Sequence, residues 1–111
     1  MHELGLCTSI VDAIERRAGT RAVARVKVRV GRFHHVHAEA FDQSFEVAAS
    51  GTVAEGAEAV LFIVPLEAAC AACGATSEVD EVVPACPACG AFDVALNGGD
   101  ELVLESIEYR A

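Results

Sequence analysis

The chain has 111 residues, enough for one small domain or for a small core with a metal-stabilised appendage. Its 17 acidic residues outnumber its 8 lysines and arginines, and the net charge of −9 argues against nucleic-acid binding, which needs a basic surface. No apolar run approaches the roughly 20 residues of a membrane helix, and the N-terminus lacks the pattern of a signal peptide. We therefore expect a cytoplasmic protein that binds neither membranes nor nucleic acid.

Residues 4–18 are expected to form the first helix, because apolar residues recur there at helical spacing. Two arginines stand near its C-terminal end, where positive charge stabilises a helix, and Gly19 is expected to end it. Cys7 lies on the apolar side, and we interpret it as a small buried hydrophobe rather than a metal ligand. The apolar side comprises Leu4, Cys7, Ile10, Val11 and Ile14.

Residues 22–30 alternate between valines and cations, which predicts a strand with one buried and one solvated face. A turn follows at 31–37. Residues 38–49 are expected to form a second helix, whose buried side holds Ala38, Phe41, Phe45 and Ala48. The uninterrupted apolar run at 59–64 predicts a central strand buried on both faces, and residues 101–109 predict a last strand.

Between the last two strands lie two C-x-x-C pairs, Cys70 with Cys73 and Cys86 with Cys89. Each pair is followed by a glycine, which can adopt the left-handed conformation that such a turn needs. Paired C-x-x-C motifs at this separation are a strong sign of a metal site, and four sulfurs suit a closed, tetrahedral, structural zinc site.

Two other roles for these cysteines compete with zinc. Disulfides are disfavoured because a cytosolic protein keeps its thiols reduced. A single iron is the other alternative, since the knuckle at 86–90 resembles that of rubredoxins. Rubredoxins surround their iron with aromatic residues, whereas Phe92 is the only aromatic residue near these knuckles and the chain has no tryptophan.

The expected fold class is therefore α/β, with a small mixed sheet, two helices and an inserted four-cysteine lobe. The α/β domain would comprise residues 1–67 with 97–111, and the zinc-binding domain residues 68–96. Four metal bonds can stabilise such a lobe although it has almost no apolar core.

His2 is the second chemical feature of the sequence. The terminal amine, the amide nitrogen of His2 and its imidazole nitrogen can bind one ion in fused chelate rings. A planar set of nitrogens suits nickel(II) or copper(II) and fits tetrahedral zinc badly. The alternative is a frayed terminus with an idle histidine.

Three segments together resemble the HypA/HybF family of nickel metallochaperones for maturation of nickel-iron hydrogenase. They are the start MHELGLCTSIVDAI, the cysteine pairs with CPACG, and the ending GGDELVLESIE. The resemblance covers essentially the whole chain, and the N-terminal MHE is its most specific element. It implies a small α/β nickel-binding domain with an inserted zinc domain, in agreement with the organisation expected above.

The resemblance also implies which residues bind each metal. His2 would be the main nickel ligand, with the terminal amine of Met1 and nearby backbone nitrogens, and Glu3 would ligate through its amide or tune the site. His37 is a candidate further nickel ligand, because some relatives have an acidic residue near that position; the alternative is that His34, His35 and His37 form a solvated loop. The zinc ligands would be Cys70, Cys73, Cys86 and Cys89.

The function that the resemblance implies is delivery of nickel(II) to the hydrogenase large-subunit precursor, with a HypB-type GTPase as partner in the transfer. No nucleophile paired with a base and no phosphate-binding loop is evident in the sequence, so we do not expect an enzyme. One alternative is a zinc-ribbon adaptor that recognises a protein partner and never carries nickel. A second is an iron redox protein that uses the same four cysteines.

Overall fold

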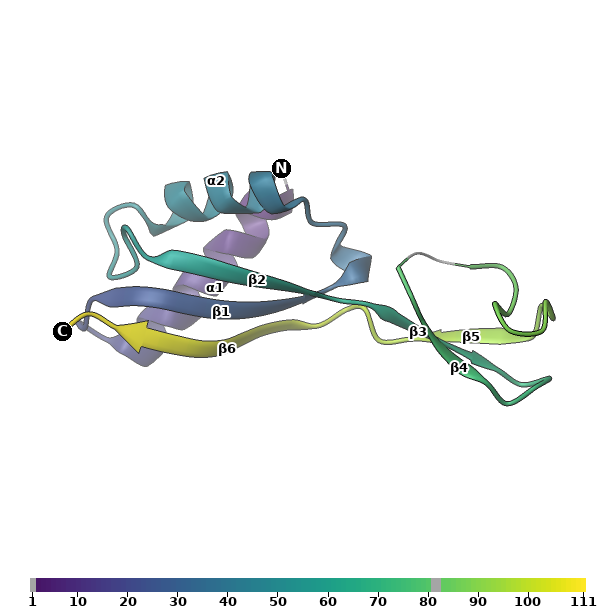
Figure 1. Ribbon diagram of the computed structural model, residues 1–111. Helices are drawn as coiled ribbons and strands as arrows, with labels where there is room; N and C mark the ends of the chain where they lie inside the picture. Colours follow the sequence, from purple (N-terminus) through teal and green to yellow (C-terminus); the bar gives the residue numbers. More distant parts are fainter. Residues whose placement is uncertain (1, 81–82) are drawn as a thin grey trace. The chain divides into compact units, whose positions relative to one another are not determined.

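The computed structural model describes residues 2–80 and 83–111 (Figure 1). Two α-helices, a short 3-10 helix and six strands follow one another along these residues. Their bounds are α1 (His2–Ala18), β1 (Val23–Gly31), η1 (Arg32–His34), α2 (Ala38–Ala49), β2 (Glu58–Val64), β3 (Leu66–Cys70), β4 (Thr76–Val79), β5 (Val94–Asn97) and β6 (Leu102–Tyr109). None of the helices in this part of the chain is long and apolar enough to span a membrane.

Both predicted helices are confirmed. Helix α1 begins at His2, two residues earlier than expected, and it ends at Ala18, where Gly19 has a positive φ of 63°. Helix α2 has the predicted bounds, but its predicted buried side is partly wrong. Ala38 is exposed and Ala49 is buried more completely than Ala48, because the residues that face the core, Phe41, Phe45 and Ala49, are spaced by four.

The first sheet has the strand order β2-β1-β6. Figure 1 shows β1 and β2 running in the same direction, with α2 returning between them. Strand β6 runs the opposite way, since Gly31 donates to the carbonyl of Glu101 (2.7 Å) and Arg110 to the carbonyl of Ala22 (2.9 Å). The predicted mixed sheet with two helices is therefore confirmed.

The prediction of a central strand at 59–64 is wrong. Strand β2 lies at the edge of the sheet, β1 occupies the centre, and no residue of β2 is fully buried. Phe62 is 52% exposed. A helix covers only one face of this sheet, so the long apolar run of β2 is half-buried rather than enclosed on both sides.

Two compact units can be separated in the chain. Unit 1 contains residues 2–29, 36–62 and 102–111, and helices α1 and α2 pack against each other within it. The rings of Phe41 and Phe45 stack with centroids 6.4 Å apart. Its buried apolar residues are Cys7, Ile10, Val11, Ile14, Ala18, Val23, Val26, Val28, Phe41, Phe45, Ala49, Ala54 and Leu104.

Unit 2 contains residues 30–35, 63–80 and 83–101 of the described chain. Its sheet has the order β4-β3-β5, and both pairs of strands are antiparallel. These three strands were not predicted, because each has only four or five residues and several of these are Ala, Ser or Thr. The buried apolar residues of this unit are Val30, Leu66, Ala68, Cys70 and Cys86.

Residues 31–33 lie beside residues 99–101 within unit 2. Phe33 donates a backbone hydrogen bond to Gly99 (2.7 Å), and Gly99 has a φ of 83°. A Cβ atom on Gly99 would collide with the side chain of Leu66. The segment after β1 is therefore bound to unit 2 by backbone contacts, while the expected domain boundaries at residues 68 and 96 stay a prediction.

Candidate metal centres

The two C-x-x-C-G segments fold into turns with the same hydrogen bonds. Gly74 and Gly90 donate to the carbonyls of Cys70 and Cys86, at 3.0 and 2.9 Å. The two glycines have φ values of 73° and 79°, in the left-handed region where a side chain is disfavoured. No atom lies within 4 Å of a Cβ built on either glycine, so the backbone conformation, rather than a lack of space, accounts for glycine here.

The two turns bring all four thiol sulfurs within 4.8 Å of one another. The Sγ atoms of Cys70 and Cys89 are 3.7 Å apart, and those of Cys73 and Cys86 are also 3.7 Å apart. Four sulfurs placed tetrahedrally at a zinc–sulfur distance of about 2.3 Å would be roughly 3.8 Å apart. The cluster therefore fits a tetrahedral ion.

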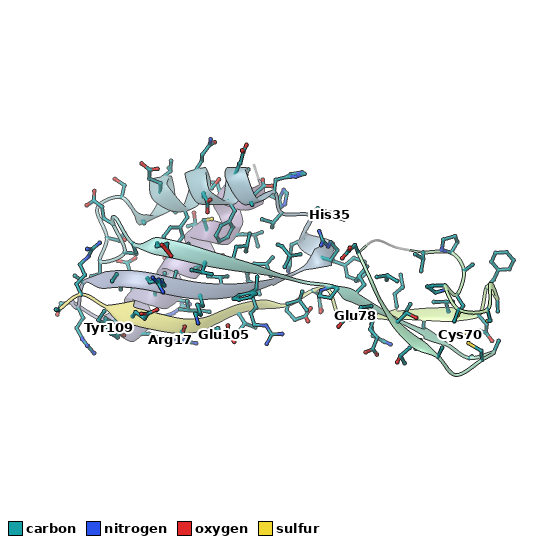
Figure 2. All side chains as sticks on the ribbon, in the orientation of Figure 1. Arg17, His35, Cys70, Glu78, Glu105 and Tyr109 are labelled. Atoms are coloured by element: carbon teal, nitrogen blue, oxygen red, sulfur yellow. The ribbon has the colours of Figure 1, made fainter. Side chains whose placement is uncertain are left out.

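The same distances argue against disulfides, whose sulfurs are about 2.05 Å apart, and all five cysteines are free. Iron would accept this geometry as well as zinc does. The surroundings favour zinc, because Phe92 is 83% exposed and forms no aromatic shell around the cluster. Figure 2 labels Cys70 at the end of β3, and its sulfur belongs to the cluster of four.

Backbone N–H groups stabilise negative charge on the cluster. The amides of Cys73 and Ala88 donate to the sulfurs of Cys70 and Cys86, at 3.5 and 3.3 Å. The pKa of Cys86 is lowered to about 7, chiefly by the backbone N–H of Cys89 and further by that of Ala88. The backbone N–H of Ala91 also lowers the pKa of Cys89, but hydrogen bonds with the sulfurs of Cys73 and Cys70 raise it to about 12, so Cys86 is the thiol that ionises first. A thiolate binds metal and a thiol does not, so these hydrogen bonds favour the metal-binding form.

The other predicted metal site lies at the start of α1. Met1 is outside the described residues, so its predicted role as a ligand stays a prediction. The first N–H groups of a helix have no acceptor within it, which leaves the amide nitrogen of His2 outside the helical hydrogen bonds, while that of Glu3 donates to its own carboxylate. The His2 side chain is 51% exposed, and its Nδ1 atom lies 3.4 Å from Oε1 of Glu3.

Glu3 is the one buried charged residue among those that the structure describes. Its Oε2 atom accepts the backbone N–H of His37 at 3.4 Å, which joins the start of α1 to the start of α2 within unit 1. The pKa of Glu3 is lowered, mainly because the carboxylate accepts its own backbone N–H. The N–H of His37 and the charge of His2 lower it further, and burial opposes them. An ionised carboxylate therefore lies beside the His2 imidazole.

The burial of Glu3 was missed in the sequence, although a signal for it was present. Glu3 precedes Cys7 by four residues and Ile10 by seven, so helical spacing places it on the buried side of α1. The pairing of Glu3 with His37 had no such signal, because 34 residues separate the two in the chain.

The histidines of the 31–37 turn do not form a cluster. The His37 side chain is exposed and only its backbone reaches Glu3, whereas His34 Nε2 lies 3.0 Å from the carbonyl of Asp100 in unit 2. His35 adopts a left-handed conformation with a φ of 50°. Over residues 2–80 and 83–111, the four cysteines are the one group of three or more His, Cys, Asp or Glu side chains placed to hold an ion. The assignment of His37 as a nickel ligand stays a prediction.

Residues 1–109 match the family model described as "Hydrogenase/urease nickel incorporation, metallochaperone, hypA". The chain is 35% identical to hydrogenase maturation factor HypA 2 of Bradyrhizobium diazoefficiens and 37% identical to hydrogenase maturation factor HypA of Rhodobacter capsulatus. Each alignment covers 97% of this chain and 98% of the relative.

The fold is similar to the solution structure of the Ni metallochaperone HypA from Helicobacter pylori. The TM-score is 0.60 and the sequence identity 18%, over 98% of this chain and 97% of the other. At this identity the match is evidence for the fold alone, and it extends over both compact units.

Proposed function

Because the chain belongs to the HypA family of metallochaperones for nickel incorporation, we propose that its N-terminal residues carry nickel(II) as cargo. The protein acts in hydrogenase maturation, and the proposed recipient is the precursor of the nickel-iron hydrogenase large subunit. The family description names hydrogenase and urease together. The relatives from Bradyrhizobium diazoefficiens and Rhodobacter capsulatus are named hydrogenase maturation factors, which supports hydrogenase as the client.

The observation that carries this proposal is the position of His2 as the first residue of α1. An exposed imidazole there stands next to the backbone amide of His2, which has no acceptor within the helix. With the terminal amine of Met1 they provide the nitrogen set that nickel(II) prefers. We assign the buried Glu3 carboxylate to holding His2 and the start of α2 in place, with the Glu3 amide as a further ligand.

The four cysteines have a different role in this proposal. Cys70, Cys73, Cys86 and Cys89 would hold a resident zinc ion with no open coordination position, so the cargo does not bind there. When bound, zinc supplies four strong bonds that stabilise the fold of unit 2.

The remaining parts of the proposal concern the setting of the transfer. A HypB-type GTPase would assist the release of nickel, the protein would work in the cytoplasm, and it would have no catalytic activity of its own. Membership of the HypA family argues against the alternative of a zinc-ribbon adaptor that never carries nickel.

The test is nickel calorimetry on the untagged protein and on two variants of its terminus. An extension of three glycines before Met1 moves the free amine too far from His2 to share a compact chelate with its ring, and His2→Ala removes the ring. Both should abolish high-affinity nickel binding while the zinc content stays at about one ion per chain.

Two controls accompany this test. Three glycines added after Ala111 should leave nickel binding unchanged, and so should His34→Ala, because His34 belongs to unit 2. His37→Ala measures whether the candidate further ligand contributes. If the N-terminally extended protein binds nickel as tightly as the untagged one, the proposed site is wrong.

A further inference from the structure

The four clustered cysteines differ in how far solvent can reach them. Cys73 and Cys89 are exposed, whereas Cys70 and Cys86 are only 5% and 4% exposed. Each C-x-x-C turn therefore contributes one sulfur from the surface and one from the interior of unit 2. A thiol that coordinates a metal is deprotonated, and the thiolate is the form that oxidants attack, so solvent access decides which sulfurs a small oxidant reaches first.

Each exposed sulfur lies close to a buried sulfur of the other turn. The Sγ atom of Cys73 is 3.7 Å from that of Cys86, and the Sγ atom of Cys89 is 3.7 Å from that of Cys70. A sulfenic acid on one cysteine condenses with a neighbouring thiol to form a disulfide. The arrangement therefore favours disulfides that join the two C-x-x-C turns to each other.

Such a disulfide is incompatible with bound zinc. It brings two sulfurs from 3.7 Å to about 2.05 Å, so two of the four thiolate ligands are no longer available to the ion. Besides the cysteines, unit 2 buries only Val30, Leu66 and Ala68 among its described apolar residues. Oxidation of the cluster is therefore expected to unfold much of unit 2, while unit 1 keeps its own apolar core.

The charge of unit 2 affects which oxidant can approach the exposed sulfurs. Its sequence holds seven aspartates and glutamates but one arginine and no lysine. One of the acidic residues, Asp93, is exposed, and its carbonyl accepts the backbone N–H of Ala71 inside the first C-x-x-C turn (2.9 Å). This charge repels an anionic oxidant such as glutathione disulfide, whereas neutral hydrogen peroxide is not repelled.

We propose that the four-cysteine cluster is a site of reversible oxidation by hydrogen peroxide, in which the exposed sulfurs are attacked first and their buried neighbours complete the disulfides. In the first step the Cys73 thiolate displaces hydroxide from hydrogen peroxide and becomes a sulfenic acid. The Cys86 thiolate then displaces a second hydroxide from that sulfur, so the two cysteines lose two electrons and the peroxide gains them. The same two steps join Cys89 to Cys70. The inference requires zinc in the cluster and does not depend on nickel as cargo.

Treatment of the untagged, zinc-loaded protein with hydrogen peroxide tests the proposal. Zinc release is followed with pyridylazoresorcinol, and disulfides are mapped by mass spectrometry after rapid alkylation. About one zinc ion per chain should be released, and the first disulfide should join Cys73 to Cys86 or Cys70 to Cys89. Reduction with a phosphine and addition of zinc should restore the zinc content and the hydrogen-exchange protection of the β3 amides. Cys7, which is fully buried in unit 1, is the internal control and should stay reduced while zinc leaves.

Two variants that keep a zinc ligand separate the two disulfides. Histidine is an accepted ligand of structural zinc, so Cys73→His and Cys89→His each leave a site of three cysteines and one histidine. Cys73→His should form only the disulfide between Cys70 and Cys89, and Cys89→His only that between Cys73 and Cys86. If either variant holds no zinc, the disulfide map of the wild type still decides between the pairs.

The choice of oxidant is tested by ionic strength. Raising NaCl from about 0.02 to about 0.5 M screens the charge of unit 2, so it should accelerate zinc release by glutathione disulfide at least about threefold. Release by hydrogen peroxide should stay unchanged, because a neutral molecule is not repelled. Equal responses to salt would overturn the selection of a neutral oxidant.

Three results would overturn the proposal as a whole. One is zinc that stays bound at peroxide concentrations that already oxidise the buried Cys7. Another is loss of zinc with sulfinic or sulfonic acids in place of disulfides, which the phosphine does not reverse. The third is a first disulfide within one C-x-x-C turn. A protein that binds no nickel would refute the proposed function and leave this proposal standing.

Discussion

The two compact units of this protein are stabilised in different ways. Unit 1 buries apolar side chains from α1, α2 and β1, including Ile14, Val26 and Phe41. Unit 2 buries only Val30, Leu66 and Ala68 among its described apolar residues besides Cys70 and Cys86, two of the four clustered cysteines. Burial of large apolar side chains stabilises a fold by about 1.5–3 kcal/mol each, so unit 1 can depend on its core, whereas unit 2 needs its metal.

Unit 2 also contains an unfavourable pair that the metal has to offset. Glu67 on β3 lies directly opposite Glu78 on β4 in the antiparallel register. Like charges at directly opposed positions destabilise a sheet. The only lysine or arginine in unit 2 is Arg32, and its guanidinium pairs with Asp80 at 3.3 Å. The difference between the units predicts that metal removal and core truncation act on different parts of the chain.

The largest effect is expected from removal of a metal ligand. Structural zinc contributes about 10–16 kcal/mol in small metal-dependent folds, so Cys73→Ser should unfold much of unit 2. Hydrogen exchange should show that the amides of β3 lose protection while those of α1 keep it. Cys7→Ala is the matched control, because Cys7 is buried in unit 1, where its pKa is raised to about 12 by burial, and its loss should leave zinc in place. If the β3 amides stayed protected from exchange in a zinc-free Cys73→Ser protein, unit 2 would not need its metal.

The reciprocal change is truncation of the unit 1 core. Phe41 is fully buried between the helices, and Phe41→Ala should lower the free energy of unfolding of unit 1 by about 3–5 kcal/mol. Urea denaturation followed by the helical circular dichroism signal measures this, with the exposed Phe92→Ala expected within about 0.5 kcal/mol of wild type. The zinc content should not change. Loss of zinc in parallel with the loss of helix would show that the units are not separate.

A smaller effect distinguishes packing from backbone conformation inside unit 2. Gly99→Ala combines a positive φ with a collision against Leu66, and should cost at least about 2 kcal/mol from strain and overpacking together. Gly74→Ala has a similar φ but open space, and should cost about 1–2 kcal/mol. Competition with a chelator measures the zinc affinity of both variants, and a destabilised unit 2 should lose zinc more readily. Equal costs would mean that the packing of Leu66 against Gly99 contributes little to unit 2.

The smallest effect, the pH dependence of nickel binding, separates the two metal sites. An imidazole and an α-amine ordinarily titrate near 6.5 and 7.7–8.0, and both must be deprotonated to bind metal, so acidification weakens nickel binding. Between pH 7.5 and 6.5 the affinity should fall about tenfold for each proton that nickel displaces. The lowered pKa of Glu3 keeps its carboxylate ionised over this range.

Zinc should remain bound in the same interval, because a bound zinc ion keeps its coordinating thiols deprotonated and four sulfurs hold it together. Calorimetry with nickel and elemental analysis for zinc at each pH test this prediction. Zinc that leaves before nickel would reverse the expected order of the two sites.

Patterns that depend on a few neighbouring residues were readable in the sequence. The C-x-x-C-G turns are local, so the spacing of Cys70 to Gly74 and of Cys86 to Gly90 was sufficient to predict the four-sulfur cluster. Helix α2 and the alternation along β1 were predicted for the same reason. The spacing of apolar residues in a helix or in a half-buried strand is visible within that segment alone. The nickel site at His2 was proposed from its position at the end of the chain, and it stays a proposal.

The sequence by itself thus determined the two helices, the alternating strand β1, the four-cysteine cluster and the family. Tertiary structure decided that the apolar run of β2 lies at a sheet edge, because strand order depends on contacts between distant segments. It also decided that Glu3 is buried against His37. These features join residues that are far apart in the chain, 34 positions in the case of Glu3 and His37. A period within one segment carries no information about which other segment will cover it.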